Sequence, residues 1–167
     1  MFNRLLMICL ISVFMVGCSH KRAHKVVVHE RDKIAESFYL TDVTFSEGIE
    51  DGAFKTDCAM LSGLEKSILD SSKTSALKVL PSNSITPEQY ELKVEYTNVE
   101  SHKWLFMAIR PSSAAEAKAS IVKNGKVLHS TTQSISSAVA FGACDRLEKI
   151  SLAQGRYISK WLSNYAK

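Results

Sequence analysis

The sequence predicts an α+β domain with a mostly antiparallel sheet of four to five strands and two roughly parallel helices on one face. The predicted order is strand, helix, strands, hairpin, helix. Residues 90–99, "YELKVEYTNV", alternate apolar and polar side chains, as a strand with one covered face does. Asn124 and Gly125 separate two runs of strand-forming residues, a strong hairpin signal. Residues 144–165 repeat apolar side chains with the period of a helix.

The first half of the domain contributes a strand, a helix and a second strand. Residues 38–46 alternate well enough for a strand, with Tyr39, Val43 and Phe45 on one face. A helix then extends from a cap at Asp57 to about residue 71. A short strand, "ALKVL", is ended by a proline. The apolar face of this helix holds Leu61, Leu64 and Ile68, with Cys58 and Leu69 at its edge.

The second half contributes the hairpin, residues 118–135, and the long terminal helix. Gly155 lies inside this helix and weakens it by ~1 kcal/mol relative to alanine. The residues that share its apolar face are Leu147, Ile150, Tyr157, Ile158, Trp161 and Tyr165.

The N-terminus has the pattern of a secretory signal. Arg4 precedes an apolar run from Leu5 to Val16 that only Ser12 interrupts. About twelve apolar residues are too few for a bilayer-spanning helix, which needs ~20. A charged start followed by a short apolar run is typical of a signal peptide. The alternative is an anchor that stays in place, but the basic residues from 20 to 25 cut the run off.

Met15-Val16-Gly17-Cys18 resembles the lipobox of bacterial lipoproteins, in which the cysteine is acylated and becomes the first mature residue. Gly17 and Cys18 match the pattern, whereas Met15 and Val16 are less usual in it. The resemblance implies lipidation at Cys18, where more than one acyl chain makes anchoring stable. Ser19 in place of aspartate implies, by similarity to enterobacterial lipoproteins, release to the outer membrane. The expected organisation is a signal peptide (1–17), a lipidated cysteine with a basic tether (18–37) and one periplasmic α+β domain (38–167).

Composition limits the classes of protein. About 150 residues remain after residue 17, enough for one core, and the 46% hydrophobic content excludes general disorder. Removal of Arg4 lowers the formal charge from +4 to +3, and most of the basic excess lies in residues 19–25. That segment is either a solvated linker or a contact with anionic headgroups. The near-neutral domain argues against nucleic acid as a partner.

The cysteines predict one disulfide. Cys9 leaves with the signal peptide and Cys18 takes the lipid, so Cys58 and Cys144 remain in an oxidising compartment. The alternative is two buried free thiols. The loop that the bond closes would stabilise the fold by ~4–5 kcal/mol in the chain-entropy model. Both cysteines start helices, so the bond requires these helices to run side by side and roughly parallel. A right-handed crossover through the first helix makes the two helices roughly parallel and permits the disulfide. If "ALKVL" instead pairs as a hairpin strand, the helices become antiparallel and the disulfide cannot form.

The order of elements resembles several envelope lipoprotein families. These are the small lipoprotein that plugs the lipopolysaccharide translocon, the auxiliary lipoproteins of envelope transporters, and a family of unknown function with a "GKVL" hairpin and a terminal helix. Residues 125–128 and 144–164 carry the last resemblance, which covers residues 38–164. It transfers no functional residue.

No catalytic constellation is present in the sequence, and we expect no enzyme, no cofactor and no metal site. His20, His24 and His29 could bind a transition metal, but loosely spaced histidines in a linker are more often solvated. Asp57 and Asp145 flank the two cysteines, where we expect helix capping and first-turn charge.

The candidate partner-binding segment lies between two predicted strands. Its apolar run either extends the preceding strand into the core or forms a hydrophobic loop at the end of the sheet, where it would bind protein or lipid. Tryptophan and arginine are enriched in interface hot spots. The candidate residues are Trp104, Leu105, Phe106, Met107 and Arg110, with Ile109 in the same run.

The expected protein is therefore a non-enzymatic, periplasm-facing outer-membrane lipoprotein. It would be an accessory or structural component of an envelope assembly, transport or secretion machine, with membrane lipid and an envelope protein as partners. The alternative is a lipoprotein that binds a lipid or other amphiphile, for which an apolar cavity under the helices is needed. The oligomeric state and the identity of the partner stay open.

Overall fold

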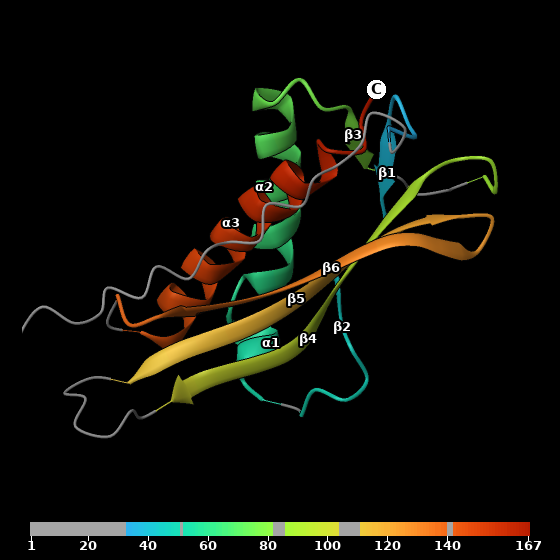
Figure 1. Cartoon of the computed structure of the whole chain (residues 1–167). Coiled ribbons are helices and arrows are strands. Elements are labelled where there is room, and N and C mark those ends of the chain that lie inside the picture. The colour runs from blue at the N-terminus through green and yellow to red at the C-terminus, as the bar shows by residue number, and fades with distance from the viewer. Residues whose placement is uncertain (1–32, 51, 82–85, 104–110, 140–141) are drawn as a thin grey trace, which may run out of the picture.

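A computed structural model describes residues 33–50, 52–81, 86–103, 111–139 and 142–167 (Figure 1). Two helices lie side by side on one face of a twisted sheet (Figure 1). The elements along the chain are β1 (Phe38–Leu40), β2 (Thr44–Phe45), α1 (Phe54–Asp57), α2 (Met60–Thr74), β3 (Val79–Pro81), β4 (Glu91–Lys103), β5 (Ser112–Lys123), β6 (Lys126–Ser137) and α3 (Ala143–Leu162).

The sheet is mixed, so the prediction of a mostly antiparallel sheet of four to five strands is wrong. Six strands take part, in the order β3-β1-β4-β5-β6, with β2 also paired to β4. β1 is parallel to both β3 and β4, and β2 is parallel to β4. Only β4-β5 and β5-β6 are antiparallel. The pair of β1 and β3 is parallel because α2 carries the chain back across the sheet before β3 begins, as a helical crossover does.

The first predicted strand is divided, and part of its predicted face is wrong. β1 and β2 are separate strands that pair one after the other with β4, at Leu40↔Leu92 and Phe45↔Tyr96. Phe38 and Leu40 are the buried side chains of β1, whereas Tyr39 is only half-buried. Phe38, Tyr39 and Leu40 are consecutive apolar residues, so their pattern does not determine which face of the strand is buried.

The first predicted helix is also divided. α1 ends at Asp57 and α2 begins at Met60, with Cys58 and Ala59 in extended or irregular backbone between them. Asp57 does not cap α2, because the N-cap residue is Ala59, which makes no side-chain cap bond. Instead the Asp57 carboxylate accepts a hydrogen bond from Thr56 Oγ1 at 2.8 Å.

The hairpin is confirmed. β5 and β6 pair in antiparallel register up to Lys123↔Lys126, and Asn124 and Gly125 form the turn between them. Their φ angles of 52° and 72° are both positive, as a two-residue type I′ turn requires. The strands extend beyond the predicted range, to Ser112 at one end and Ser137 at the other.

The core lies between the sheet and the helix pair. The strand face predicted for Leu92, Val94 and Tyr96 is buried at 0–2% exposure. Alanines of β5 lie below α3 and allow the helix to approach the sheet closely. The large side chains that fill this layer at 0–2% exposure are Leu64, Ile68, Leu92, Ile121, Leu147, Ile150, Ile158 and Leu162.

Candidate functional site at the disulfide end

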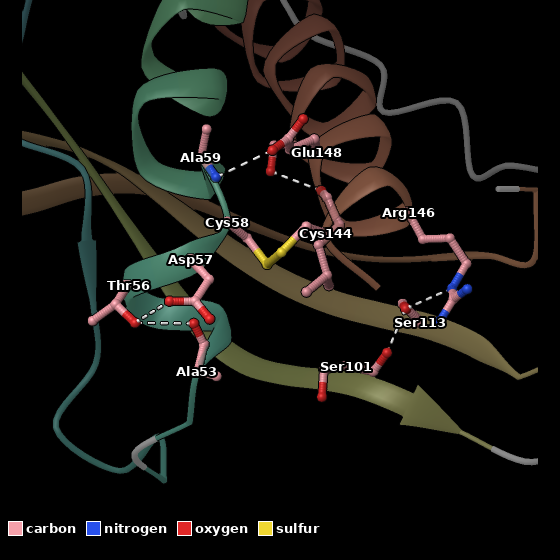
Figure 2. The surroundings of a disulfide bond; sticks show 12 residues. Ala53, Thr56, Asp57, Cys58, Ala59, Ser101, Ser113, Cys144, Arg146 and Glu148 are labelled. Carbon is pink, nitrogen blue, oxygen red and sulfur yellow. Dashed lines mark hydrogen bonds between the residues drawn. A yellow bond between two sulfur atoms is a disulfide. The ribbon is translucent and has the colours of Figure 1, made fainter. Parts of the chain in front are cut away.

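A disulfide joins Cys58 to Cys144, as the sequence predicts, with 4.9 Å between the two Cα atoms (Figure 2). Cys58 lies just before α2, and Cys144 is the second residue of α3. The bond therefore ties the beginnings of two helices. From this point α2 and α3 run in the same general direction, since Ser67 meets Gly155 further along both helices.

A carboxylate from α3 completes the start of α2. The backbone N–H of Ala59 donates a hydrogen bond to Glu148 Oε1 at 3.3 Å (Figure 2). The first N–H groups of a helix have no partner within the helix, and negative charge is favourable at that end. Glu148 thus supplies from another helix the cap that Asp57 was expected to supply locally.

Two serines clamp the base of the segment between β4 and β5. Ser112 Oγ donates to Lys103 O at 3.2 Å, and Ser113 Oγ donates to Ser101 O at 2.6 Å. Both bonds cross from the first residues of β5 to the last residues of β4. They hold the last residues of β4 and the first residues of β5 together.

Arg146 links this clamp to α3. Its side chain is 1% exposed, and its Nε donates to Ser113 Oγ at 2.9 Å (Figure 2). An arginine is buried only where hydrogen-bond partners receive it. The sequence prediction did not include Arg146 in the buried face of the terminal helix. Its spacing of four residues from Ile150 nevertheless places it on that face. Positions at steps of four along α3 are all buried, namely Arg146, Ile150, Gln154, Ile158 and Leu162.

Two neighbouring hollows open at this end of the domain. One, of about 280 Å³, lies over the disulfide and is lined by Phe54, Cys58, Ser101, His102 and Cys144 among others. The other, of about 620 Å³, shares Phe54, Ser101 and His102 and extends along β4. Phe54 is held by an edge contact to the Phe45 ring, 5.9 Å between centroids. The end of the domain therefore has a rigid frame and an indented surface.

The remaining predicted site residues lie outside the described residues. These are the lipidation site Cys18 and the partner-binding candidates Trp104, Leu105, Phe106, Met107 and Arg110. Their strand neighbours Lys103 and Ser112 are described and sit at the disulfide end. The structure thus locates the two ends of the candidate segment and leaves the contact itself a prediction.

Metal ligands do not gather in the part of the chain that the structure describes: no three histidine, cysteine, aspartate or glutamate side chains cluster there. The tether histidines His20, His24 and His29 lie outside it. Within the same described ranges, none of the helices combines the length and apolar content that crossing a bilayer requires.

No protein-family model and no curated protein matches the chain. Among solved structures, protein XCC0632 from Xanthomonas campestris, of the family DUF330, matches with a TM-score of 0.57 and 11% sequence identity, over 78% of this chain and 85% of that chain. The hypothetical protein CT253 from Chlamydia trachomatis matches with a TM-score of 0.56 and 13% identity, over 78% and 98%. Lipoprotein GNA1162 from Neisseria meningitidis scores lower, 0.47, with 16% identity over 75% and 99%. At these identities, the likeness to the first two establishes a shared fold and nothing about function.

Proposed function

We propose that the chain is a non-enzymatic outer-membrane lipoprotein, anchored through acylated Cys18 and facing the periplasm. It would act as an accessory or structural component of an envelope assembly, transport or secretion machine. The observation that carries the proposal is the pairing of Cys58 with Cys144. Disulfides persist in oxidising compartments such as the periplasm and are rare in the cytosol. The pairing therefore supports the export that Met15–Cys18 predicts.

The filled core supports a role that is performed by the surface. An amphiphile-binding protein needs an apolar space between its helices and its sheet. In the described structure that layer is occupied by large side chains such as Leu64, Ile68 and Leu147, each fully buried. The alternative function, binding of a lipid or other amphiphile inside the domain, therefore has less support than binding of a protein partner.

The disulfide end has the properties of a docking surface. The described residues on either side of the segment from Trp104 to Arg110 are joined by the serine bonds, and fixed ends lower the entropy that a segment loses on binding. Its apolar and arginine side chains are of the kinds that dominate interface energies. We therefore propose residues 104–110 as the principal contact with an envelope protein.

Photo-crosslinking in intact cells tests this contact. A photoreactive side chain in place of Trp104 should yield one adduct with an envelope protein, which mass spectrometry identifies. The same side chain at Thr132, exposed in the middle of β6, should yield none. Equal labelling from both positions would contradict the proposed surface.

The variant Trp104→Ala separates a contact from a core residue. A side chain that serves a partner adds little to the stability of the isolated domain, so the thermal midpoint should move by less than about 2 °C. Capture of the partner should fall. A midpoint lower by 10 °C or so would place Trp104 in the core and remove residues 104–110 as the docking surface.

A further inference from the structure

The tip of the β5-β6 hairpin exposes apolar side chains that the fold does not use. We call residues 123–128 the hairpin tip. Val127 is 55% exposed and Leu128 is 39% exposed. In the part of the chain that the structure describes, the other large apolar side chains with comparable exposure are Val139 and Leu152. Two of these four side chains, those of Val127 and Leu128, are therefore neighbours at the start of β6.

A break in strand register lies at these two residues. On a regular strand, neighbouring side chains point to opposite faces. Here Ile121 pairs with His129 and Val122 pairs with Val127, which leaves Leu128 as an extra residue in β6. Such bulges are retained features that redirect side chains.

The hairpin tip is cationic as well as apolar. Lys123 and Lys126 flank the turn, and the sequence has no aspartate or glutamate between Glu116 and Asp145. Lys123 Nζ lies 4.2 Å from the centre of the Tyr90 ring, and Lys126 is exposed. The carboxylates on the neighbouring 86–91 segment are those of the exposed Glu88 and of Glu91, whose Oε1 is 3.4 Å from Lys93 Nζ.

This tip lies at the end of the domain where the tether enters. The N–H of Ile34 donates to Tyr165 O at 2.9 Å, and the Tyr165 ring stacks on His129 with 4.4 Å between centroids. His129 follows Leu128 directly. The first described residues, the C-terminus and the hairpin tip therefore share one end of the molecule, while the starts of α2 and α3, which the disulfide joins, lie at the other (Figure 1).

The number of residues between Cys18 and the domain limits how far this end can lie from the proposed anchor. Fourteen residues, 19–32, separate Cys18 from Lys33. A chain of that length spans at most about 50 Å. β6 alone, twelve residues long, extends about 40 Å toward the opposite end. With Cys18 acylated as proposed, the hairpin tip lies at the end of the domain from which the chain continues toward the anchor, and Val139 lies at the opposite end.

We propose that the hairpin tip is a membrane-contact surface, in which Val127 and Leu128 enter the headgroup region of the anchoring bilayer and Lys126 binds anionic headgroups. Apolar side chains beside lysines are typical of interfacial segments. The contact would orient the domain on the membrane and present residues 104–110 to the periplasm. The membrane contact rests on the proposed lipid anchor at Cys18, and it adds a defined orientation of the domain relative to the bilayer.

Depth-dependent quenching on the acylated full-length mature protein tests the contact. Val127→Cys and Val139→Cys form a matched pair, because both valines are exposed, Val127 is the second residue of β6 and Val139 lies two residues beyond its other end. Each cysteine carries an environment-sensitive fluorophore, while the native cysteines are acylated or in the disulfide. The protein is reconstituted in vesicles of phosphatidylethanolamine and phosphatidylglycerol that contain doxyl-labelled lipid. We expect at least about twofold quenching at position 127 and almost none at 139.

A charge variant tests the headgroup part of the proposal. Lys126→Gln should lower the ratio of docked to undocked tip by about fivefold, which the position 127 probe reports as weaker quenching. Lys66→Gln, an exposed lysine of α2, should leave the ratio unchanged. Vesicles of phosphatidylcholine alone carry no net charge, so they should also lower the ratio of docked to undocked tip, as Lys126→Gln does.

The outcomes separate this inference from the proposed function. A mature protein that does not float with the vesicles would overturn the anchor, and the contact with it. A protein that floats but shows equal quenching at positions 127 and 139 would overturn the contact alone. A probe at 127 that is shielded from aqueous iodide yet not quenched by doxyl lipid would assign the tip to a protein neighbour, which also overturns it.

Discussion

Tyr96 carries a hydroxyl group into the centre of the domain. Its side chain is 0% exposed, and its hydroxyl donates to Ser151 Oγ at 2.8 Å, which in turn donates to Leu147 O at 2.9 Å. The chain of bonds connects the sheet to α3 and satisfies a polar group that would otherwise be costly to bury. Burial raises the pKa of Tyr96 from 10.0 to about 12, and the hydrogen bond with Ser151 offsets part of that rise.

This pKa predicts a loss of stability at alkaline pH. The unfolded state releases the Tyr96 proton near pH 10, whereas the folded state keeps it to about pH 12. The contribution is therefore complete below pH 10 and is lost as the pH rises from 10 to 12, by up to about 2–3 kcal/mol. Tyr96→Phe should remove this dependence and cost about 1 kcal/mol at pH 7. Urea unfolding from pH 8 to 12 measures both.

The difference between the two proteins isolates Tyr96, because every other titratable group is the same in both. Parallel curves of unfolding free energy against pH for the native protein and Tyr96→Phe would show that Tyr96 ionises freely. They would contradict its burial beneath α3.

At the scale of elements, the helix pair depends on small residues at the crossing. A Cβ at Gly155 would lie 2.4 Å from Ser67 Cβ, closer than real Cβ atoms approach, and 3.0 Å from Ile68 N, which is a tight contact with backbone. Ser67 Oγ donates to Leu152 O at 2.8 Å, and Ser159 Oγ donates to Ile68 O at 3.0 Å. Close backbones and serine bonds thus replace the usual interlocking of large side chains.

Two glycine-to-alanine substitutions should therefore have opposite effects. Gly155→Ala should destabilise the domain by about 1–3 kcal/mol, because overpacking exceeds the gain in helix propensity. Gly63→Ala, on the facing helix, would place its Cβ 3.7 Å from Ser151 Cβ, an ordinary contact. It should stabilise by up to about 1 kcal/mol. Chemical unfolding measures both, and stabilisation by Gly155→Ala would contradict the close crossing.

The elements also show how far sequence reasoning reaches. The hairpin and the buried face of β4 could be predicted because each depends on a local pattern, the Asn124-Gly125 turn and strict alternation. The direction of β3 relative to β4 depends on where the connections cross, which no local pattern records. The break of the first helix at Cys58 has the same cause, since the disulfide and the Glu148 cap come from a distant segment.

Within the candidate site, the disulfide was predictable and the serine clamp was not. Two cysteines in an exported domain leave one pairing to consider. Ser101 and Ser113, by contrast, are ordinary strand residues until the register of β4 and β5 brings them together beside Arg146. Serines are too frequent in this chain for such a contact to stand out before the register is known.

At the scale of the whole molecule, the domain has two distinct ends. One gathers residues 33–35, the C-terminus and the hairpin tip, and the other holds the disulfide, the serine clamp, the end of β4 and the start of β5. An anchored protein with this arrangement would keep one end at the membrane and offer the other to a partner. The disulfide, which closes a separation of 86 residues, would stabilise the fold by ~4–5 kcal/mol in the chain-entropy model.

Non-reducing peptide mapping by mass spectrometry, on protein isolated from the envelopes of cells that produce it, tests the account most directly. We predict that the mature chain begins at an acylated Cys18 and contains one linked peptide pair that joins Cys58 to Cys144. A chain that retains residues 1–17 without lipid, or that carries free thiols at both positions, would contradict the account.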